Sequence, residues 1–164
     1  MTYRILTVCT GNICRSPMAE YQLREAIEAR GLSDRVEVAS VGTTSWEQGE
    51  PIDGRAGALL RERGIDASSH RARHMSAEEV QAADLVLALD TDHLDPLHRV
   101  AGNAKDRVRM LREFDPEVGD DPGIRDPWYG ADEDFETVHA QIAAALDGIL
   151  DHVEAELAGT GTSR

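Results

Sequence analysis

Two cysteines and an arginine lie in one short segment near the N-terminus, which reads CTGNICRS from Cys9 to Ser16. The segment follows an apolar run and precedes a sequence of helical composition, so its backbone N–H groups are expected to converge near a helix N-terminus. Such a turn attracts an anion, and the planar guanidinium of Arg15 suits two phosphate oxygens. The positive electrostatic potential of this turn and of Arg15 also favours the ionised, nucleophilic thiolate of Cys9. The segment therefore indicates attack by Cys9 on a bound phosphate ester.

The residues around this pair make the pattern more specific than a cysteine and an arginine six positions apart, which arise often by chance. Gly11 is expected to supply backbone angles that are closed to other residues. Pro17 fits the first turn of a helix, and the Ser16 hydroxyl can donate a hydrogen bond to sulfur. Nucleotide-binding loops end in Gly-Lys-Ser/Thr, and this chain contains no Gly-Lys. We predict phosphate contacts from Thr10, Gly11, Asn12, Ile13, Cys14, Arg15 and Ser16.

A thiol that attacks a phosphate ester needs a proton donor for the leaving oxygen. Asp126, in the segment RDPWYG, is the best candidate. Asp-Pro alone is equally a turn signal. The adjacent Trp128 and Tyr129 favour the catalytic interpretation, because exposed aromatic side chains in a loop can wall a slot for an aromatic ring, whereas a plain turn does not need them.

Composition limits the classes of protein to which the chain can belong. Its 164 residues suit one domain, which we place at 1–158 with a flexible tail at 159–164. The net charge of −14 disfavours nucleic acid and anionic membranes as partners. No apolar run approaches the roughly 20 residues of a membrane span, and the first residues do not resemble a signal peptide, so we expect a cytoplasmic protein.

The two cysteines make neither a disulfide scaffold nor a zinc site. No long apolar seam remains for a partner, so we expect a monomer.

Apolar runs alternate with helical patterns along the chain. Strands are predicted over 4–8, 36–40, 85–89 and 108–111. Helices are predicted over 18–30, 53–63, 92–100 and 135–157, with a long loop at 115–131. This alternation predicts an α/β fold with a parallel sheet and helices on both faces. Because the first strand ends at Cys9, the reactive segment is placed at the carboxyl edge of the sheet, where such folds bind ligands.

Several segments together resemble a known family. VCTGNICRSPMAE matches the signature loop of the low molecular weight protein tyrosine phosphatases, and DPWYG matches their acid-loop pattern. VASVGTTSW, SHRAR and LVLALD resemble the intervening segments in the same order. The likeness spans essentially the whole chain and is greatest to the actinobacterial branch. It implies a four-stranded parallel sheet in a flavodoxin-like arrangement.

The resemblance also implies roles for individual residues. Cys9 would be the nucleophile, Arg15 would stabilise the transition state, and Asp126 would protonate the tyrosyl oxygen and then activate water. Residues that support the phosphate-binding loop would be Asn12, Ser16, Ser40 and His70. Residues that form the substrate slot would be Ile13, Trp46, Trp128 and Tyr129. The substrates would be phosphotyrosine-containing proteins, and neither a metal nor an organic cofactor is implied.

Without the resemblance, some of these residues have simpler interpretations. His70 reads as a surface histidine, Ser40 as an ordinary strand end and Trp46 as a core residue. Asp90, at the end of the LVLAL strand, is assigned no chemistry. Trp128 stands where the family usually has tyrosine, which should reshape the slot. Val41 replaces a commonly small alanine after Ser40, which bears on the packing beneath the loop.

Alternative functions remain to be weighed. Relatives that act on phosphoarginine carry Thr in place of Ile13, and the apolar Ile13 suits an aromatic ring better. Arsenate reductases with a similar loop need further cysteines, which are absent. A module that binds phosphotyrosine without cleaving it should have lost Cys9 or Asp126.

Cys14 is either a small buried thiol or a partner that protects Cys9 as a reversible disulfide. Relatives in the actinobacterial branch are exported without a signal peptide, so export stands beside a cytoplasmic location.

Overall fold

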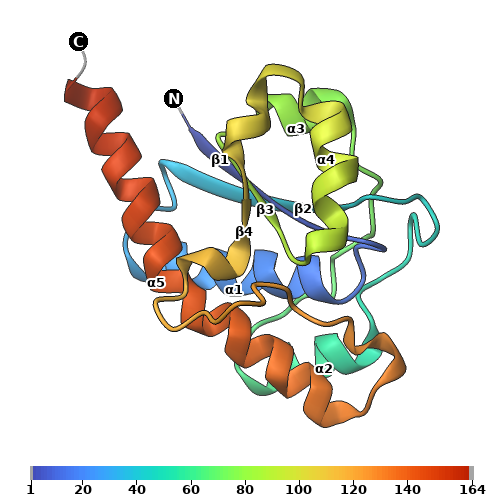
Figure 1. The fold of residues 1–164 in the computed structure, drawn as a ribbon. Helices are drawn as coiled ribbons and strands as arrows, with labels where there is room; N and C mark the ends of the chain where they lie inside the picture. Colours follow the sequence, from blue (N-terminus) through green and yellow to red (C-terminus); the bar gives the residue numbers. More distant parts are fainter. Residues whose placement is uncertain (1, 163–164) are drawn as a thin grey trace.

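The computed structural model describes residues 2–162 and contains one four-stranded parallel sheet in the order β2-β1-β3-β4 (Figure 1). The strands are β1 (Tyr3–Cys9), β2 (Val36–Gly42), β3 (Leu85–Ala88) and β4 (Val108–Met110). The α-helices are α1 (Arg15–Ala29), α2 (Gly54–Glu62), α3 (Ala77–Ala82), α4 (Leu94–Ala101) and α5 (Asp132–Thr162). The predicted α/β class and flavodoxin-like parallel sheet are confirmed.

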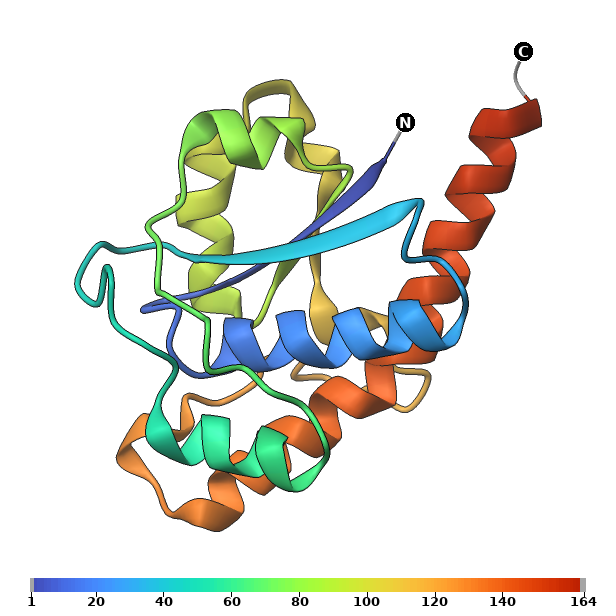
Figure 2. The ribbon, with the colours of Figure 1, turned by 180° about the vertical axis from the view of Figure 1, so that it is seen from behind.

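Helices cover both faces of the sheet, with α1 and α5 on one side and α3 and α4 on the other (Figures 1 and 2). Side chains along each strand point alternately toward these two helical layers. Ile5 and Leu87 belong to the core that contains α1 and α5, whereas Leu6, Val8 and Val86 belong to the core under α3 and α4. Because a strand directs successive side chains to opposite faces, strands buried on both faces read as the continuous apolar runs found in the sequence.

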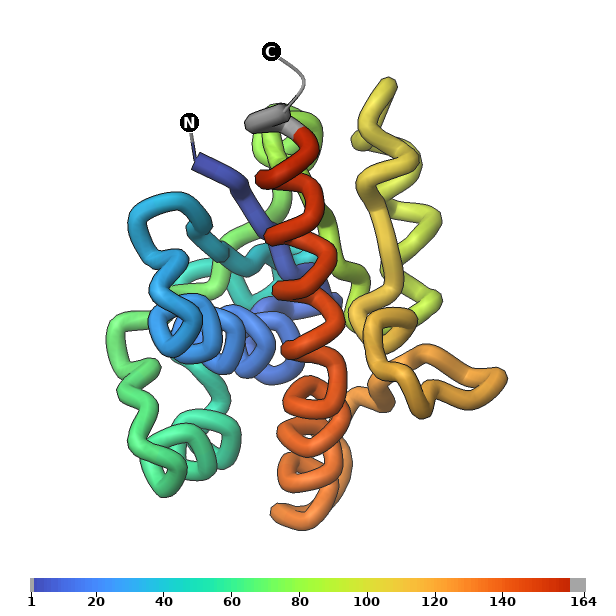
Figure 3. The backbone as a smooth tube through the Cα atoms, turned by 90° about the vertical axis from the view of Figure 1, so that its left-hand side faces the viewer, coloured from blue at the N-terminus to red at the C-terminus, as the bar shows by residue number. Residues whose placement is uncertain are grey.

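The observed helices differ from the predicted ones mainly at their ends. Helix α1 begins at Arg15, before the predicted start at residue 18, so Pro17 lies in its first turn. Helix α3 was not predicted, because it is only six residues long and Val80 is its one buried residue. The last helix begins earlier than predicted, at Asp132, where acidic side chains complement the helix dipole. It also continues through Thr162, past the predicted end at 157, and lies alongside α1 (Figure 3). Of the predicted tail, residues 163–164 lie outside the described residues.

The ends of three strands meet at one edge of the sheet. In the β-sheet register Cys9 pairs with Gly42, and Val8 pairs with Ala88. The segment after Cys9 therefore runs past the ends of β2 and β3. In parallel α/β folds this edge, at the carboxyl ends of the strands, is where ligands bind. Between residues 2 and 162, no helix is both long and apolar enough to cross a bilayer.

Candidate active site

Residues Cys9–Ser16, here called the phosphate loop, contain a strained backbone position. Asn12 has a φ of 62°, in the left-handed region that few side chains tolerate. The prediction that Gly11 supplies the special angle is wrong, because Gly11 is not among the glycines with positive φ. Gly11 is instead a point of close approach: a Cβ there would lie 3.2 Å from Cγ of Glu47. Asparagine is suited to the strained position because its side chain can bond locally.

Asn12 is held by polar contacts on every side and is fully buried. Its Nδ2 donates to Oγ of Ser16 at 2.8 Å and to Oγ of Ser40 at 2.9 Å. Its Oδ1 accepts from the backbone N–H of Arg73 at 2.9 Å, and its carbonyl oxygen accepts from Nε2 of His70 at 2.7 Å. The structure thus brings the other three predicted loop-supporting residues, Ser16, Ser40 and His70, into direct contact with Asn12.

The same network leads to the sulfur of Cys9. Oγ of Ser16 accepts from Asn12 and lies 3.0 Å from Sγ of Cys9. Its one hydrogen therefore has two acceptors within reach, this sulfur and the carbonyl oxygen of Val41 at 3.3 Å. At the other end, the Ser40 hydroxyl donates to Oε1 of Glu20 at 2.6 Å. Glu20 is buried, is ion-paired with Arg24, and was not predicted. It lies four residues after Ser16, on the same face of α1, and that spacing was the available signal.

Arg15 is 4% exposed and is oriented by oxygen atoms from the segment after β4 and from Asp90, two residues after β3. Its Nη1 donates to the carbonyl oxygen of Ile124 at 2.9 Å. Oδ2 of Asp126 lies 3.5 Å from Nη2, and Oδ2 of Asp90 lies 3.6 Å from Nη1. Asp90 was assigned no chemistry from the sequence, although an acidic residue just past the end of a buried parallel strand is placed at the ligand-binding edge.

His93 supports the phosphate loop from the side of β3 and was also not predicted. Its Nε2 lies 3.0 Å from Oγ1 of Thr10, and its Nδ1 accepts from the backbone N–H of Asp90 at 3.0 Å. Because Nδ1 is the acceptor, Nε2 carries the hydrogen and donates it to Thr10. Burial, together with the charge of Arg15, lowers the pKa of His93 to about 3. The imidazole is therefore neutral at neutral pH.

Gly42 allows the phosphate loop to approach β2 closely. A Cβ at Gly42 would lie 2.6 Å from the carbonyl oxygen of Thr10. Backbone hydrogen bonds from Thr43 to Cys9 and from Thr44 to Thr10 follow at 2.9 and 3.2 Å. Val41 is completely buried on the α3/α4 side, so the larger side chain is accommodated in the core.

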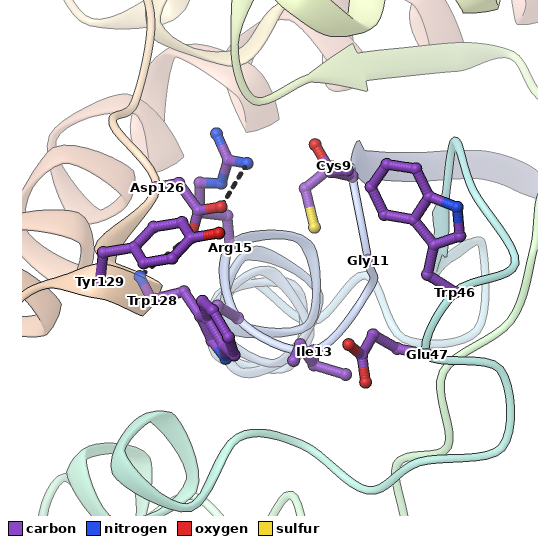
Figure 4. Close-up of a pocket in the computed structure, with 11 residues that line it drawn as sticks. Cys9, Gly11, Ile13, Arg15, Trp46, Glu47, Asp126, Trp128 and Tyr129 are labelled. Atoms are coloured by element: carbon purple, nitrogen blue, oxygen red, sulfur yellow. Dashed lines mark hydrogen bonds and ion pairs between the residues drawn. The ribbon is translucent and has the colours of Figure 1, made fainter.

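The phosphate loop forms the floor of a pocket of about 210 Å³. Trp46 borders it on one side, and Trp128 and Tyr129 border it on the other (Figure 4). The remaining lining residues are Cys9, Thr10, Gly11, Ile13, Cys14, Arg15, Glu47 and Asp126. The side chains of Asn12 and Ser16, both predicted to contact phosphate, are fully buried and do not line the pocket.

Asp126 reaches the pocket from the 3₁₀ turn Pro127–Tyr129, in the segment 126–130 that we call the acid loop. Its Oδ1 accepts from the backbone N–H of Trp128 at 3.1 Å, and its Oδ2 faces Arg15. The carboxylate is 43% exposed, and the aromatic side chains of the pocket mouth are more open still: Trp46 is 78% and Tyr129 87% exposed. The structure therefore brings the predicted nucleophile, guanidinium and proton donor together beneath an aromatic rim.

Cys14, the second cysteine of the phosphate loop, is held in its neutral form. Both cysteines are free and buried. Burial raises the pKa of the Cys14 thiol far above its ordinary value, and the negative charge of Asp53 adds to this effect. Cys14 is thus a neutral thiol at physiological pH and a poor nucleophile. Within the part of the chain that the structure describes, no three His, Cys, Asp or Glu side chains are grouped to hold a metal ion.

Comparison with known proteins gives one consistent answer. The family model for "Low molecular weight phosphotyrosine protein phosphatase" matches residues 4–159. Low molecular weight protein-tyrosine phosphatase A of Mycobacterium tuberculosis is 46% identical over 95% of this chain and 94% of its own length. The low molecular weight protein-tyrosine-phosphatase of Streptomyces coelicolor is 43% identical over 97% and 98%. A crystal structure of a protein tyrosine phosphatase from Entamoeba histolytica superimposes with a TM-score of 0.89 at 26% identity, covering 94% of this chain and 99% of that one. Because these matches span the sheet, the phosphate loop and the acid loop alike, the chain belongs to the low molecular weight phosphotyrosine protein phosphatase family.

Proposed function

We propose that the chain hydrolyses phosphotyrosine in proteins through a phosphocysteine intermediate at Cys9. One observation carries the proposal. The sulfur of Cys9, the guanidinium of Arg15 and the carboxylate of Asp126 face a single small pocket that is rimmed by aromatic side chains (Figure 4). The similar proteins of Mycobacterium and Streptomyces belong to the same family, and phosphotyrosine is the phosphate ester whose aromatic ring suits that rim.

In the first step the Cys9 thiolate attacks phosphorus. A lone pair on sulfur forms the S–P bond while the P–O bond to the tyrosyl ring breaks, and its electron pair stays on the phenolic oxygen. Asp126 gives that oxygen a proton, so neutral tyrosine leaves. Because Oδ1 of Asp126 accepts the Trp128 N–H, the transferable proton belongs on Oδ2. A bound phosphate dianion favours this protonated form, since two nearby negative charges repel.

In the second step water attacks the phosphocysteine. The Asp126 carboxylate takes a proton from the water as its oxygen bonds to phosphorus, and the S–P bond breaks to return the thiolate and release inorganic phosphate. Arg15 and the amides of the phosphate loop stabilise the charge on the phosphoryl oxygens in both steps. The Ser16 hydroxyl, 3.0 Å from sulfur, stabilises the thiolate as it forms and departs.

The proposal is tested by hydrolysis of a phosphotyrosine peptide in wild-type protein and in Cys9→Ser and Asp126→Asn. We expect Cys9→Ser to abolish turnover while inorganic phosphate still protects the protein against thermal unfolding. Asp126→Asn should lower kcat/KM by about 10²–10⁴-fold. Turnover retained by Cys9→Ser would remove the nucleophile. A matched phosphoarginine peptide serves as the second substrate, and equal or faster cleavage of that peptide would reassign the substrate class despite the apolar flank that Ile13 presents to the pocket.

We further infer a single catalytic domain over 1–158 that acts as a cytoplasmic monomer on protein substrates and binds neither nucleic acid nor membrane. The net charge of −14 supports the exclusion of polyanionic partners. Light scattering after size-exclusion chromatography tests the monomer, and a mass of twice 17.9 kDa would contradict it.

A further inference from the structure

Arg55, at the start of α2, links the two loops of the active site although it does not line the pocket. Its Nη2 donates to the carbonyl oxygen of Trp128 at 3.1 Å, and its Nη1 donates to that of Gly130 at 3.3 Å. Its guanidinium also lies 4.6 Å above the ring of Phe135, at the start of α5. One planar group thus contacts the acid loop twice and the helix that follows it.

Asp53 connects this arginine to the phosphate loop. Its carboxylate accepts from Nη2 and Nε of Arg55 at 3.1 and 3.2 Å, and its backbone N–H donates to the carbonyl oxygen of Ile13 at 2.8 Å. Burial tends to raise the pKa of Asp53, but the hydrogen bonds from the side chain and backbone of Arg55 outweigh it, so the pKa is lowered. Asp53 therefore remains an anionic anchor, 11% exposed, between the two loops.

The backbone that Arg55 holds also orients the acid. The N–H of Trp128 bonds Oδ1 of Asp126, and the carbonyl of the same residue accepts from Arg55. A continuous series of contacts therefore runs from Ile13 through Asp53, Arg55 and Trp128 to the carboxylate. We propose that Arg55 is the positioning residue for the general acid, fixing Asp126 at its working distance from the phosphate loop.

This inference rests on the proposed function, because it presumes that Asp126 is the proton donor. Its physical basis is geometric: proton transfer requires hydrogen-bond reach, and a displacement of about 1 Å can cost about 10²-fold in rate. The side chain of Asp126 is 43% exposed and contacts only Arg15 and the Trp128 N–H among the described residues, so its position depends on the turn that carries it. Arg55 acts on that turn from outside the pocket and touches no reacting atom.

The test uses two aryl phosphates whose leaving groups differ in how much they need a proton from a general acid. Phenyl phosphate releases a phenol as basic as tyrosine, with a pKa of about 10, whereas 4-nitrophenyl phosphate releases a much more acidic one. The readout is the ratio of kcat/KM for the nitrophenyl ester to that for the phenyl ester. We expect Arg55→Met, which keeps an unbranched apolar side chain but removes the donors and the guanidinium above Phe135, to raise this ratio about tenfold. Arg55→Lys, which keeps the charge but not the paired donors, should raise it less.

Arg63 provides a matched control, since it follows α2 and pairs with Glu136 of α5 at 2.7 Å without contacting the acid loop. Arg63→Met should leave the ratio unchanged. A merely structural role for Arg55 predicts equal losses on both esters, and that result in both Arg55→Met and Arg55→Lys would overturn the proposal. In the Asp126→Asn background, Arg55→Met should change kcat/KM for phenyl phosphate less than twofold; a full additional loss would likewise overturn it.

The same experiment separates this inference from the function beneath it. If Asp126→Asn does not raise the ratio, Asp126 is not the acid and the proposed mechanism fails. If Asp126→Asn raises the ratio and neither Arg55 variant does, the mechanism stands and the positioning role of Arg55 is refuted.

Discussion

The phosphate loop and the acid loop face the same pocket but are built in opposite ways. The phosphate loop is mostly buried, contains a left-handed Asn12, and is bonded to Ser40 of β2, to His93 in the turn after β3, and to His70. The acid loop is exposed, and its main ties are the Asp126 cap of its own turn and the two carbonyl bonds from Arg55. One loop is part of the core, whereas the other lies on its surface.

This difference predicts whether a substitution in each loop affects stability, activity or both. In the phosphate loop the polar groups that shape the anion site are also buried groups that folding must satisfy, so a substitution should damage both properties together. In the acid loop the groups remain solvated, so a substitution should alter catalysis or substrate binding at nearly constant stability. Each of the following variants tests that division.

Gly42→Ala should have the largest effect. The new Cβ would meet the Thr10 carbonyl oxygen at 2.6 Å, and a backbone atom cannot rotate away. We expect a loss of about 10²-fold in kcat/KM, because the phosphate loop must shift, with about 1–3 kcal/mol of destabilisation from overpacking. Gly54→Ala is the control, since a Cβ there meets nothing within 4 Å. Loss of activity at unchanged stability would break the proposed coupling of the two properties in this loop.

Asn12 allows strain and hydrogen bonding to be separated. Asn12→Ala and Asn12→Gly both remove the donors to Ser16 and Ser40, so both should lower kcat/KM and each should cost about 1–3 kcal/mol for buried groups left unpaired. Both variants must adopt the φ of 62°, but only for Ala does this angle cost about 1–2 kcal/mol, because glycine has no Cβ. Denaturant unfolding of the two variants measures the difference. Equal stabilities would show that the left-handed position carries no cost.

The contrast between the loops also explains what sequence could reveal. Cys9, Arg15 and Asp126 were found because they lie in short segments whose residue types state their chemistry, and the family followed from those segments. Asp90 and His93 were missed because they act across the sheet edge, on Arg15 and Thr10, and no local pattern reports that contact. The Gly11 prediction failed for a related reason: the left-handed residue is Asn12, and two groups that satisfy its amide, the Ser40 hydroxyl and the Arg73 N–H, are distant in sequence.

His93 should make the buried loop sensitive to acid. Its pKa in the folded protein is about 3, below the value of about 6.5 expected in the unfolded chain, so the unfolded state binds the extra proton first. Stability from this group is complete above pH 6.5 and is lost as pH falls toward 3. His93→Gln removes the titration and retains a donor that can reach Thr10.

Denaturant unfolding at several pH values measures the effect. Relative to His93→Gln, the wild-type protein should lose about 1.4 kcal/mol per pH unit below 6.5, or about 2 kcal/mol by pH 5. Carboxylate titrations are common to both proteins and cancel in the comparison. Parallel stability curves for the two proteins would mean that His93 does not remain neutral in the folded state.

Trp128→Ala should have the smallest effect of these variants, and it should separate substrate binding from stability most clearly. Its ring packs edge-on against Tyr129, with centroids 4.7 Å apart, and is 44% exposed, so its removal opens one wall of the pocket without exposing a core. The Arg55 bond goes to the Trp128 carbonyl oxygen, which survives the substitution, so Asp126 should stay in place. We expect KM for a phosphotyrosine peptide to rise up to tenfold, with kcat nearly unchanged and stability within about 0.5 kcal/mol. Trp128→Phe, which keeps an aromatic wall, should restore most of the loss. A marked fall in kcat or stability would instead place this side chain in the core-like half of the site and remove the distinction between the two loops.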